Sequence, residues 1–567
     1  MASLLNHNDP QSEQPNVLAS TTATTKRVDF VSDLPWEIVK YNLVPRILGE
    51  VRLMIHLDRP IAYMRVCSNW SKRILLADDS IYFYYGDEIY PDDDYDIRTR
   101  MMAPYIKWLS IRKCSEEHIG RLLKCGKLVR LNHLYIPCNP QVYRRFHQLL
   151  QIIPTLTHLN IDYGRFGTPL AIWDVLDQCP KLIRLKIDLH LYATMDTANS
   201  QVDRPYGNVT HLQVICWDPM KNDIYIPLIK RLPNLCLLAL TLSSSPAGLN
   251  IIQQHCPKLQ GLYLSQRRVN DVGLDEISQQ QQQQQQEGLR LLSLAGGTYD
   301  EDDIAALMVH NHDTLESIVL EGQFFTITPT RALRKDPVQF NNLRSLSYRY
   351  QPHYRSIDFY EWILQCAPNL ESVETVNAAT QRHVLDRTFS DDGPLKRIGL
   401  YCARDEQQPY ERQFLKRHIQ RGVESRLEHL KCTLERTIRD RTWVYLIPQL
   451  NQLKTLEVAF TADGKIHELG KFLKQVACGC TALEKVIFKT KYFPPSSEWI
   501  LHLATHRTLQ HLVIDTEDIP DDLTTHLEAF GHLKSLHLNH DITAFGPILE
   551  LKRKLPFFTF EHRHEPK

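Results

Sequence analysis

The chain has 567 residues, enough for about four ordinary domains or for one long array of repeats. Its 66 Lys and Arg residues balance 66 Asp and Glu residues, so the net charge predicts neither a nucleic acid nor an anionic membrane as a partner. No run of about 18 apolar residues predicts a transmembrane helix, and the 13 Cys residues, an odd number without framework spacing, favour a reducing compartment. We therefore expect a cytoplasmic or nuclear protein.

The start of the chain is polar and has no aromatic side chain before Phe30, which predicts a disordered tail over residues 1–27. This tail lacks the basic segment and apolar core of a secretory signal, so none is expected.

Residues 28–76 have the pattern of a small helical domain. Asp33 can cap a helix whose first turn contains Pro35 and Glu37, because proline fits the first helical position. Apolar residues recur through the rest of the segment. A helical unit of this size cannot bury its apolar face internally, which favours a partner-binding element.

This segment resembles an F-box. The residues that carry the resemblance are Leu34-Pro35-Trp36-Glu37-Ile38 at its start and Val66-Cys67-Ser68-Asn69-Trp70 at its end. The resemblance implies docking on a Skp-type adaptor. The contacts it implies are Leu34, Pro35, Glu37, Ile38, Leu43, Ile47, Val66 and Trp70. Residues 77–104, rich in Tyr and Asp, are predicted to be a linker.

From residue 105 the chain repeats a phrase of the form L-x-x-L-x-L, as at Leu131, Leu134 and Ile136. Its copies run from Ile106 to Leu533 about 27 residues apart, the period and strand phrase of a leucine-rich repeat. The predicted fold class is therefore α/β. We expect residues 105–567 to form a leucine-rich-repeat solenoid of about 17 repeats, a horseshoe of parallel strands with outer helices and a C-terminal cap. The small all-α F-box-like domain precedes it.

Between these strands, apolar residues three and four apart predict helices. The predicted helices are Val142–Ile153, Ile172–Gln178, Ile251–His255, Ile304–His310, Phe359–Gln365, a longer one through Phe414–Val423, and Glu498–Ala504. The eight glutamines Gln279–Gln286 predict a solvated loop. The aromatic phrase from Leu555 to Phe560 predicts a strand that closes the last repeat.

The sequence lacks the motifs of the common catalytic and metal sites. It has no P-loop, no G-x-G-x-x-G, no G-x-S-x-G, no H-E-x-x-H and no C-x-x-C. Cys478 and Cys480 are separated by one residue without suitable His partners, so we interpret them as a loop thiol and a core thiol. We therefore expect no enzyme, no metal and no cofactor.

In each phrase the leucines face the core, so the residues between them face the concave side of the horseshoe. These positions are polar in the early and late repeats and apolar or small in the middle ones, as a recognition surface would be. The other interpretation is that strands carry such residues by propensity. The candidate substrate-binding residues are His133, Tyr135, His158, Asn160, Arg184, Lys186, His211, Leu237, Tyr263, Leu291, Arg349 and Tyr401.

An F-box followed directly by leucine-rich repeats resembles the substrate receptor of an SCF (Skp–cullin–F-box) ubiquitin ligase. The resemblance implies a Skp-type adaptor, through it a cullin, and a protein target held by the repeats. The alternative is a leucine-rich-repeat scaffold or inhibitor without a ubiquitin role, in which residues 30–76 only cap the first repeat. The two differ in whether the apolar residues of the F-box-like segment face outward.

Overall fold

The computed structural model describes most of the repeat array and short parts of the N-terminal region. The described residues are 34–39, 54–56, 69, 72–73, 76, 82–85, 103–111, 116–126, 128–138, 140–164, 169–190, 193–197, 204–217, 222–241, 249–265, 288–325, 338–348, 357–375, 381–382, 384–385, 394–402, 409–434, 443–460, 469–490, 500–516, 523–530, 532–540 and 558–562. The predicted tail 1–27 and the glutamine run Gln279–Gln286 lie outside them.

One parallel sheet of 20 strands runs through the described chain. Each strand pairs with its two neighbours, except that β1 pairs only with β2 and β22 only with β21. Each predicted repeat phrase has its strand. The strands of the sheet are β1 (Met54–His56), β2 (Tyr82–Tyr85), β3 (Trp108–Ile111), β4 (His133–Cys138), β5 (His158–Tyr163), β7 (Arg184–Leu189), β9 (His211–Cys216), β10 (Leu237–Thr241), β11 (Gly261–Ser265), β12 (Leu291–Asp300), β13 (Ser317–Phe325), β14 (Ser345–Tyr348), β15 (Ser372–Thr375), β16 (Arg397–Cys402), β17 (His429–Leu434), β18 (Thr455–Phe460), β19 (Lys485–Thr490), β20 (His511–Thr516), β21 (Ser535–His540) and β22 (Phe558–His562). Strands β6 (Leu170–Ala171) and β8 (Met195–Asp196) pair separately.

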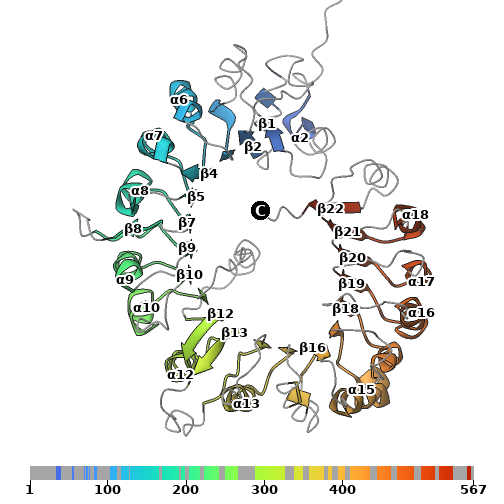
Figure 1. Ribbon diagram of the computed structural model, residues 1–567. Coiled ribbons are helices and arrows are strands. Elements are labelled where there is room, and N and C mark those ends of the chain that lie inside the picture. The colour runs from blue at the N-terminus through green and yellow to red at the C-terminus, as the bar shows by residue number, and fades with distance from the viewer. Residues whose placement is uncertain are drawn as a thin grey trace, which may run out of the picture.

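Helices connect the strands and lie on the outside of the curved sheet, while the strands line its inside (Figure 1). A helix is about 10 Å wide and neighbouring strands are about 4.8 Å apart, so stacked repeats curve with the strands inward. The helices are α2 (Trp36–Ile38), α6 (Glu116–Cys125), α7 (Pro140–Gln151), α8 (Ile172–Gln178), α9 (Asn222–Lys230), α10 (Leu249–His255), α12 (Glu301–His310), α13 (Ile357–Cys366), α15 (Pro409–Arg421), α16 (Leu469–Gly479), α17 (Leu501–Ala504) and α18 (Leu523–Leu527). The 3₁₀ turns are η3 (Ala103–Tyr105), η5 (Gly422–Glu424), η7 (Val444–Gln449) and η9 (Glu528–Phe530).

The predicted helices are present, with ends that differ by a few residues. Helix α7 begins at Pro140, because proline fits the first turn. The long helix predicted through Phe414–Val423 is α15 followed by the 3₁₀ turn η5. Helix α17 begins at Leu501, three residues later than predicted.

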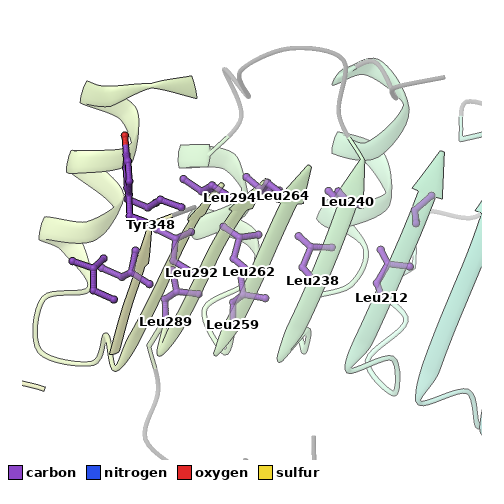
Figure 2. Packing of buried hydrophobic residues seen from close by; sticks show 14 of the residues in the cluster. Leu212, Leu238, Leu240, Leu259, Leu262, Leu264, Leu289, Leu292, Leu294 and Tyr348 are labelled. Atoms are coloured by element: carbon purple, nitrogen blue, oxygen red, sulfur yellow. The ribbon is translucent and has the colours of Figure 1, made fainter. Parts of the chain in front are cut away.

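The core lies between the sheet and the helices and is built from leucine rows. Figure 2 shows one row with Leu238 and Leu262, and a second with Leu240 and Leu264. The rows form because each leucine is aligned, in the strand register, with the leucine at the same phrase position of the next strand. These side chains are at most 3 % exposed, so the repeats share one continuous apolar core.

The sheet begins earlier than the sequence predicts. Strand β1 lies within the range assigned to the helical domain, and β2 lies within the predicted linker; β1 pairs with β2, and β2 pairs with β3. The run Tyr82–Tyr85 is entirely aromatic, a composition that favours strands. A further strand also covers the edge that the first repeat would otherwise expose. Strand β22 covers the opposite edge by pairing with β21, as predicted.

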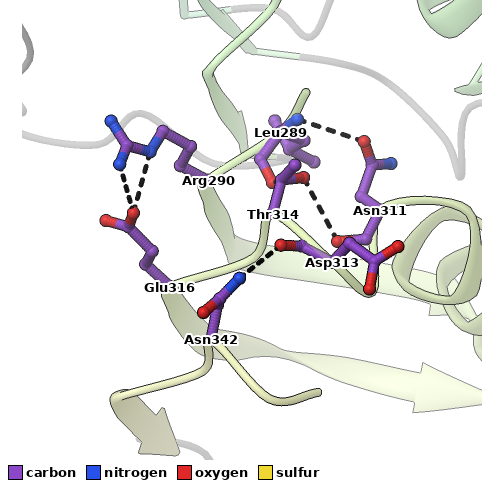
Figure 3. Close-up of polar contacts among 7 residues, drawn as sticks. All are labelled: Leu289, Arg290, Asn311, Asp313, Thr314, Glu316 and Asn342. Atoms are coloured by element: carbon purple, nitrogen blue, oxygen red, sulfur yellow. Dashed lines mark hydrogen bonds and ion pairs between the residues drawn. The ribbon is translucent and has the colours of Figure 1, made fainter. Parts of the chain in front are cut away.

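Asparagine side chains in the turns before the strands tie consecutive repeats together. Those of Asn208, Asn234 and Asn369 each donate a hydrogen bond to a backbone carbonyl of the preceding turn, at 2.7–3.0 Å. Asn342 makes the same contact with the carbonyl of Asp313 (Figure 3). These bonds supply a donor to carbonyl groups in the turns, which lie outside the hydrogen-bonded strands.

Candidate functional site

The described start of the F-box-like segment places apolar side chains on two sides. Val39 is fully buried and Leu34 packs against the repeat core, whereas Trp36 and Ile38 are 38 % and 41 % exposed. Nη2 of Arg73 donates a hydrogen bond of 2.6 Å to the backbone oxygen of Leu34, which ties this short segment to the end of the predicted F-box. Two large apolar side chains therefore remain open to solvent beside a fixed anchor.

The predicted adaptor contacts are only partly within the described residues. Pro35, Glu37 and Ile38 are exposed, and Leu34 is partly buried. The remaining four, Leu43, Ile47, Val66 and Trp70, lie outside the described residues. Their contact with an adaptor stays a prediction.

The concave face of the early repeats follows the predicted alternation. In β4, β5 and β7 half-buried and buried residues alternate, because successive side chains point to opposite faces of the sheet. The predicted candidates on these three strands and His211 on β9 are all half-buried. The sheet brings them into adjacent rows, although the chain separates them by a whole repeat.

A stack of aromatic rings runs across the neighbouring strands β3, β4 and β5. The rings of Trp108 and His133 lie 3.3 Å apart between centroids, and those of His133 and His158 lie 3.8 Å apart. The register of β3, β4 and β5 sets these pairs directly opposite each other. Thr157 and Thr210 fix the imidazoles of His158 and His211, since each threonine hydroxyl lies 2.8 Å from the Nδ1 of the histidine that follows.

Burial and positive charge keep two of these histidines neutral. Burial, then the charges of His158 and Arg184, lowers the pKa of His133 to about 3. Burial, then Arg184 and His158, lowers the pKa of His211 to about 4. Arg184 is the cation that acts on both imidazoles, in addition to their burial.

Two carboxylates lie near the other end of the same strands. Asp162 contacts Nε2 of His190 and accepts a hydrogen bond of 3.4 Å from the hydroxyl of Tyr135. Asp188 is its register partner on β7. The concave face here is therefore cationic where the strands begin and acidic where they end.

The central repeats differ from the accessible apolar patch that the sequence predicts. Every residue of β10 and β11 is buried, on both faces. Leu237, Ala239 and Tyr263 form a second small apolar cluster with Leu291 packed against it. Burial raises the pKa of Tyr263. Whether these residues contact a target stays a prediction.

A row of ion pairs crosses the later repeats. Nζ of Lys431 contacts the carboxylate of Glu374 and lies 3.6 Å from Oε1 of Glu457, while Nζ of Lys489 lies 3.0 Å from the same oxygen. Gly399 stands between Glu374 and Lys431 in register. A Cβ there would lie 2.8 Å from Cγ of Glu374, so the missing side chain lets Glu374 reach across β16.

We expect Lys431→Met to lower the free energy of unfolding by about 1–3 kcal/mol, because it removes the cation that contacts Glu374, a carboxylate that is only 21 % exposed, whereas Glu457 keeps Lys489. Lys489→Met is the matched control. It removes a more exposed cation and should cost less, about 0–1 kcal/mol. Urea unfolding followed by circular dichroism measures both, and equal losses would contradict the role of Lys431.

Sequence reasoning missed the ion-pair row, although the signal was present. The phrase positions of Glu374, Gly399 and Lys431 align once the repeats are stacked, and charges of opposite sign flank a glycine. Of the other two late candidates, Tyr401 is half-buried and its backbone N–H donates to Oε1 of Gln381 at 2.6 Å. Arg349 lies outside the described residues.

Cys480 is buried, as predicted, with its Sγ donating to the carbonyl of Ile447 at 3.3 Å. Cys478 is exposed but lies in the last turn of α16 and not in a loop. Across the ranges described above, no group of three or more His, Cys, Asp and Glu side chains is placed to hold a metal ion. The helices within those ranges are also too short or too polar to cross a membrane.

No protein-family model and no curated protein matches the chain. It is similar to a solved chain in the crystal structure of the yeast Rad7 and Elc1 complex, with 14 % identity over 61 % of this chain and 85 % of that one, at a TM-score of 0.30. A chain of the Drosophila Toll–Spatzle complex is 11 % identical over 81 % of this chain and 48 % of that one, also at 0.30. A function therefore has to be argued from the residues of this chain.

Proposed function

We propose that the chain is the substrate-recognition adaptor of an SCF-type E3 ubiquitin ligase. The F-box-like segment binds a Skp-type adaptor, and the leucine-rich repeats bind a protein target. The chain itself is not an enzyme, and it promotes transfer by holding the target at a high effective concentration. The observation that carries this proposal is the exposure of Trp36 and Ile38 beside the buried Val39.

Those two side chains can supply the free energy of adaptor binding when a partner covers them. Full burial of a large apolar side chain contributes about 1.5–3 kcal/mol, and tryptophan is common among the residues that dominate interfaces. The short helix that carries them is held by the Arg73 bond to Leu34. A partner therefore meets a segment that is already positioned, which lowers the entropic cost of binding.

A second function, a repeat scaffold without a ubiquitin role, is favoured by a different observation. Val39 is fully buried and β1 extends the sheet, both of which fit a segment that caps the first repeat. Capping alone does not require Trp36 and Ile38 to be exposed. Binding of a Skp-type adaptor is therefore the property that separates the two functions.

The test is capture of a purified Skp-family adaptor by the full-length chain. We expect Trp36→Ala/Ile38→Ala to weaken binding at least about tenfold, which corresponds to about 1.4 kcal/mol. Trp217→Ala/Ile183→Ala is the matched control, because these residues have the same types and are 41 % and 39 % exposed on the repeats. It should bind as the wild type does.

Two outcomes would count against the adaptor function. One is no capture by the wild-type chain, which leaves the scaffold. The other is equal weakening by both double variants, which would show that any exposed apolar pair has the same effect. Leu34 is not used as the probe, because its packing against the core would confound binding with folding.

A further inference from the structure

Two aliphatic side chains on the concave face of the late repeats remain partly open to solvent. Ile487 on β19 and Val513 on β20 are register partners, and both are half-buried. They point away from the core, because the residues before and after each of them in its strand are fully buried and face the other side of the sheet. These two residues are called here the β19–β20 pair.

Polar side chains enclose the β19–β20 pair. On the same face of the sheet, the residues two positions before and after each member are polar, and so are the register partners on β18 and β21. These neighbours are Glu457, Lys485, Lys489, His511, Asp515 and His537. An apolar centre inside a polar rim is the usual anatomy of a protein-binding surface.

Lys485 is the residue of this rim whose charge is not matched. Nζ of Lys489 lies 3.0 Å from Oε1 of Glu457, and Asp515 has an interaction of its own. None of the residues that the structure describes forms an ion pair with Lys485. Its register partners are Thr455 and His511, and neither carries a negative charge. A ligand carboxylate at this point would therefore displace no existing ion pair.

The place of the pair in the fold favours a slender protein segment as its occupant. The strands line the inside of the curved sheet (Figure 1), which the helical outer face of a second copy cannot enter as an extended segment can. The pair and its rim contain no Trp, Tyr or Phe ring, on which a single-stranded nucleic acid would stack. In an extended segment alternate side chains lie about 6.6 Å apart, which is also the spacing between Lys485 and Ile487 along β19.

We propose that the β19–β20 pair binds an extended segment of the target protein, in which an aliphatic side chain covers Ile487 and Val513 and an acidic side chain two residues away pairs with Lys485. This inference rests on the proposed function for the existence of a protein target. The aliphatic contact supplies most of the affinity, because it removes apolar surface from water. The ion pair sets the register of the segment on the sheet.

The test measures the fluorescence anisotropy of a labelled peptide, Gly-Ser-Glu-Ser-Leu-Ser-Gly, with the full-length chain. We expect the wild-type chain to bind this leucine peptide. Serine in place of the peptide leucine should weaken binding at least about tenfold, because it removes the aliphatic contact. Glutamine in place of the peptide glutamate should weaken binding about threefold, as loss of a partly exposed ion pair does.

Variants of the chain locate the aliphatic contact. Val513→Thr should weaken binding of the leucine peptide at least about threefold, because it puts a hydroxyl in place of a methyl group at nearly constant volume. Val319→Thr is the matched control, since Val319 is a half-buried valine at the same phrase position of β13, and it should stay within about twofold. Ile487→Thr/Val513→Thr should weaken binding at least about tenfold.

A second pair of variants locates the ion pair. Lys485→Gln should remove the preference for the glutamate peptide over the glutamine peptide, because the unmatched cation is gone. Lys489→Gln removes a cation from the same face of β19 that Glu457 already holds, so the preference should remain. Circular dichroism checks the folding of each variant.

The inference would be overturned by no binding of the leucine peptide, by equal binding of the leucine and serine peptides, or by equal losses in Val513→Thr and Val319→Thr. Self-association of the wild-type chain that Ile487→Thr/Val513→Thr abolishes, measured by sedimentation velocity, would overturn it as well, because the occupant would then be a second copy. Adaptor capture without peptide binding would refute only this inference, and peptide binding without adaptor capture would refute only the proposed function.

Discussion

Gly479→Ala is expected to lower the free energy of unfolding by about 4 kcal/mol or more. A Cβ at this position would lie 1.9 Å from the backbone oxygen of Pro448 and 2.8 Å from its carbonyl carbon. Gly479 ends α16 and Pro448 lies within η7, so neither backbone can shift locally without moving the rest of its helix or turn. The helix and the turn must separate, which disrupts the packing of α16 against η7.

Urea unfolding and amide hydrogen exchange of α16 and η7 measure this effect, because a repeat array can open locally before it unfolds as a whole. Cys478→Ala is the matched control, since its side chain is exposed on the same helix, and it should change stability by no more than about 0.5 kcal/mol. A Gly479→Ala chain as stable as the control would show that α16 and η7 do not lie this close in solution.

The stability of the chain is expected to fall as the pH drops from about 7 to 5, and His418 should account for about 2 kcal/mol of that loss. Burial, then the charges of Arg421 and Arg417, lowers the pKa of His418 to about 4. The unfolded chain takes up a proton near pH 6.5 and the folded chain only near 4, so acid favours unfolding between those values. The neutral imidazole is held against Ser425, whose Oγ lies 2.9 Å from Nδ1.

His418→Gln removes this titration, so we expect a flatter dependence of the unfolding free energy on pH than in the wild type. Because the change is in slope, it is distinct from any constant loss that the substitution causes. His532→Gln, at an exposed histidine, is the matched control for the His-to-Gln change itself. An unchanged slope in His418→Gln would contradict a neutral buried imidazole at this position.

Local pattern was sufficient for the repeats, because each phrase carries its own signal. The phrase leucines of β10 and β11 are two residues apart, and residues at that spacing lie on one face of a strand. The pattern therefore predicts a strand with its leucine face in the core. The polar early candidates, such as His158 and Arg184, were placed on the concave side by the same alternation. The first two strands were not predicted, because β1 has only three residues and depends on pairing with β2.

The sequence by itself determined the period, the parallel sheet, the outer helices and the face on which each strand residue lies, since all four follow from spacing along one repeat. Only the tertiary structure decided which residues of different repeats meet. Glu374 reaches Lys431 across Gly399, and Gly479 approaches the carbonyl of Pro448, because stacking sets a register between segments one or two repeats apart. The clustering of Tyr263 with Leu237 and Ala239 likewise joins residues of different repeats.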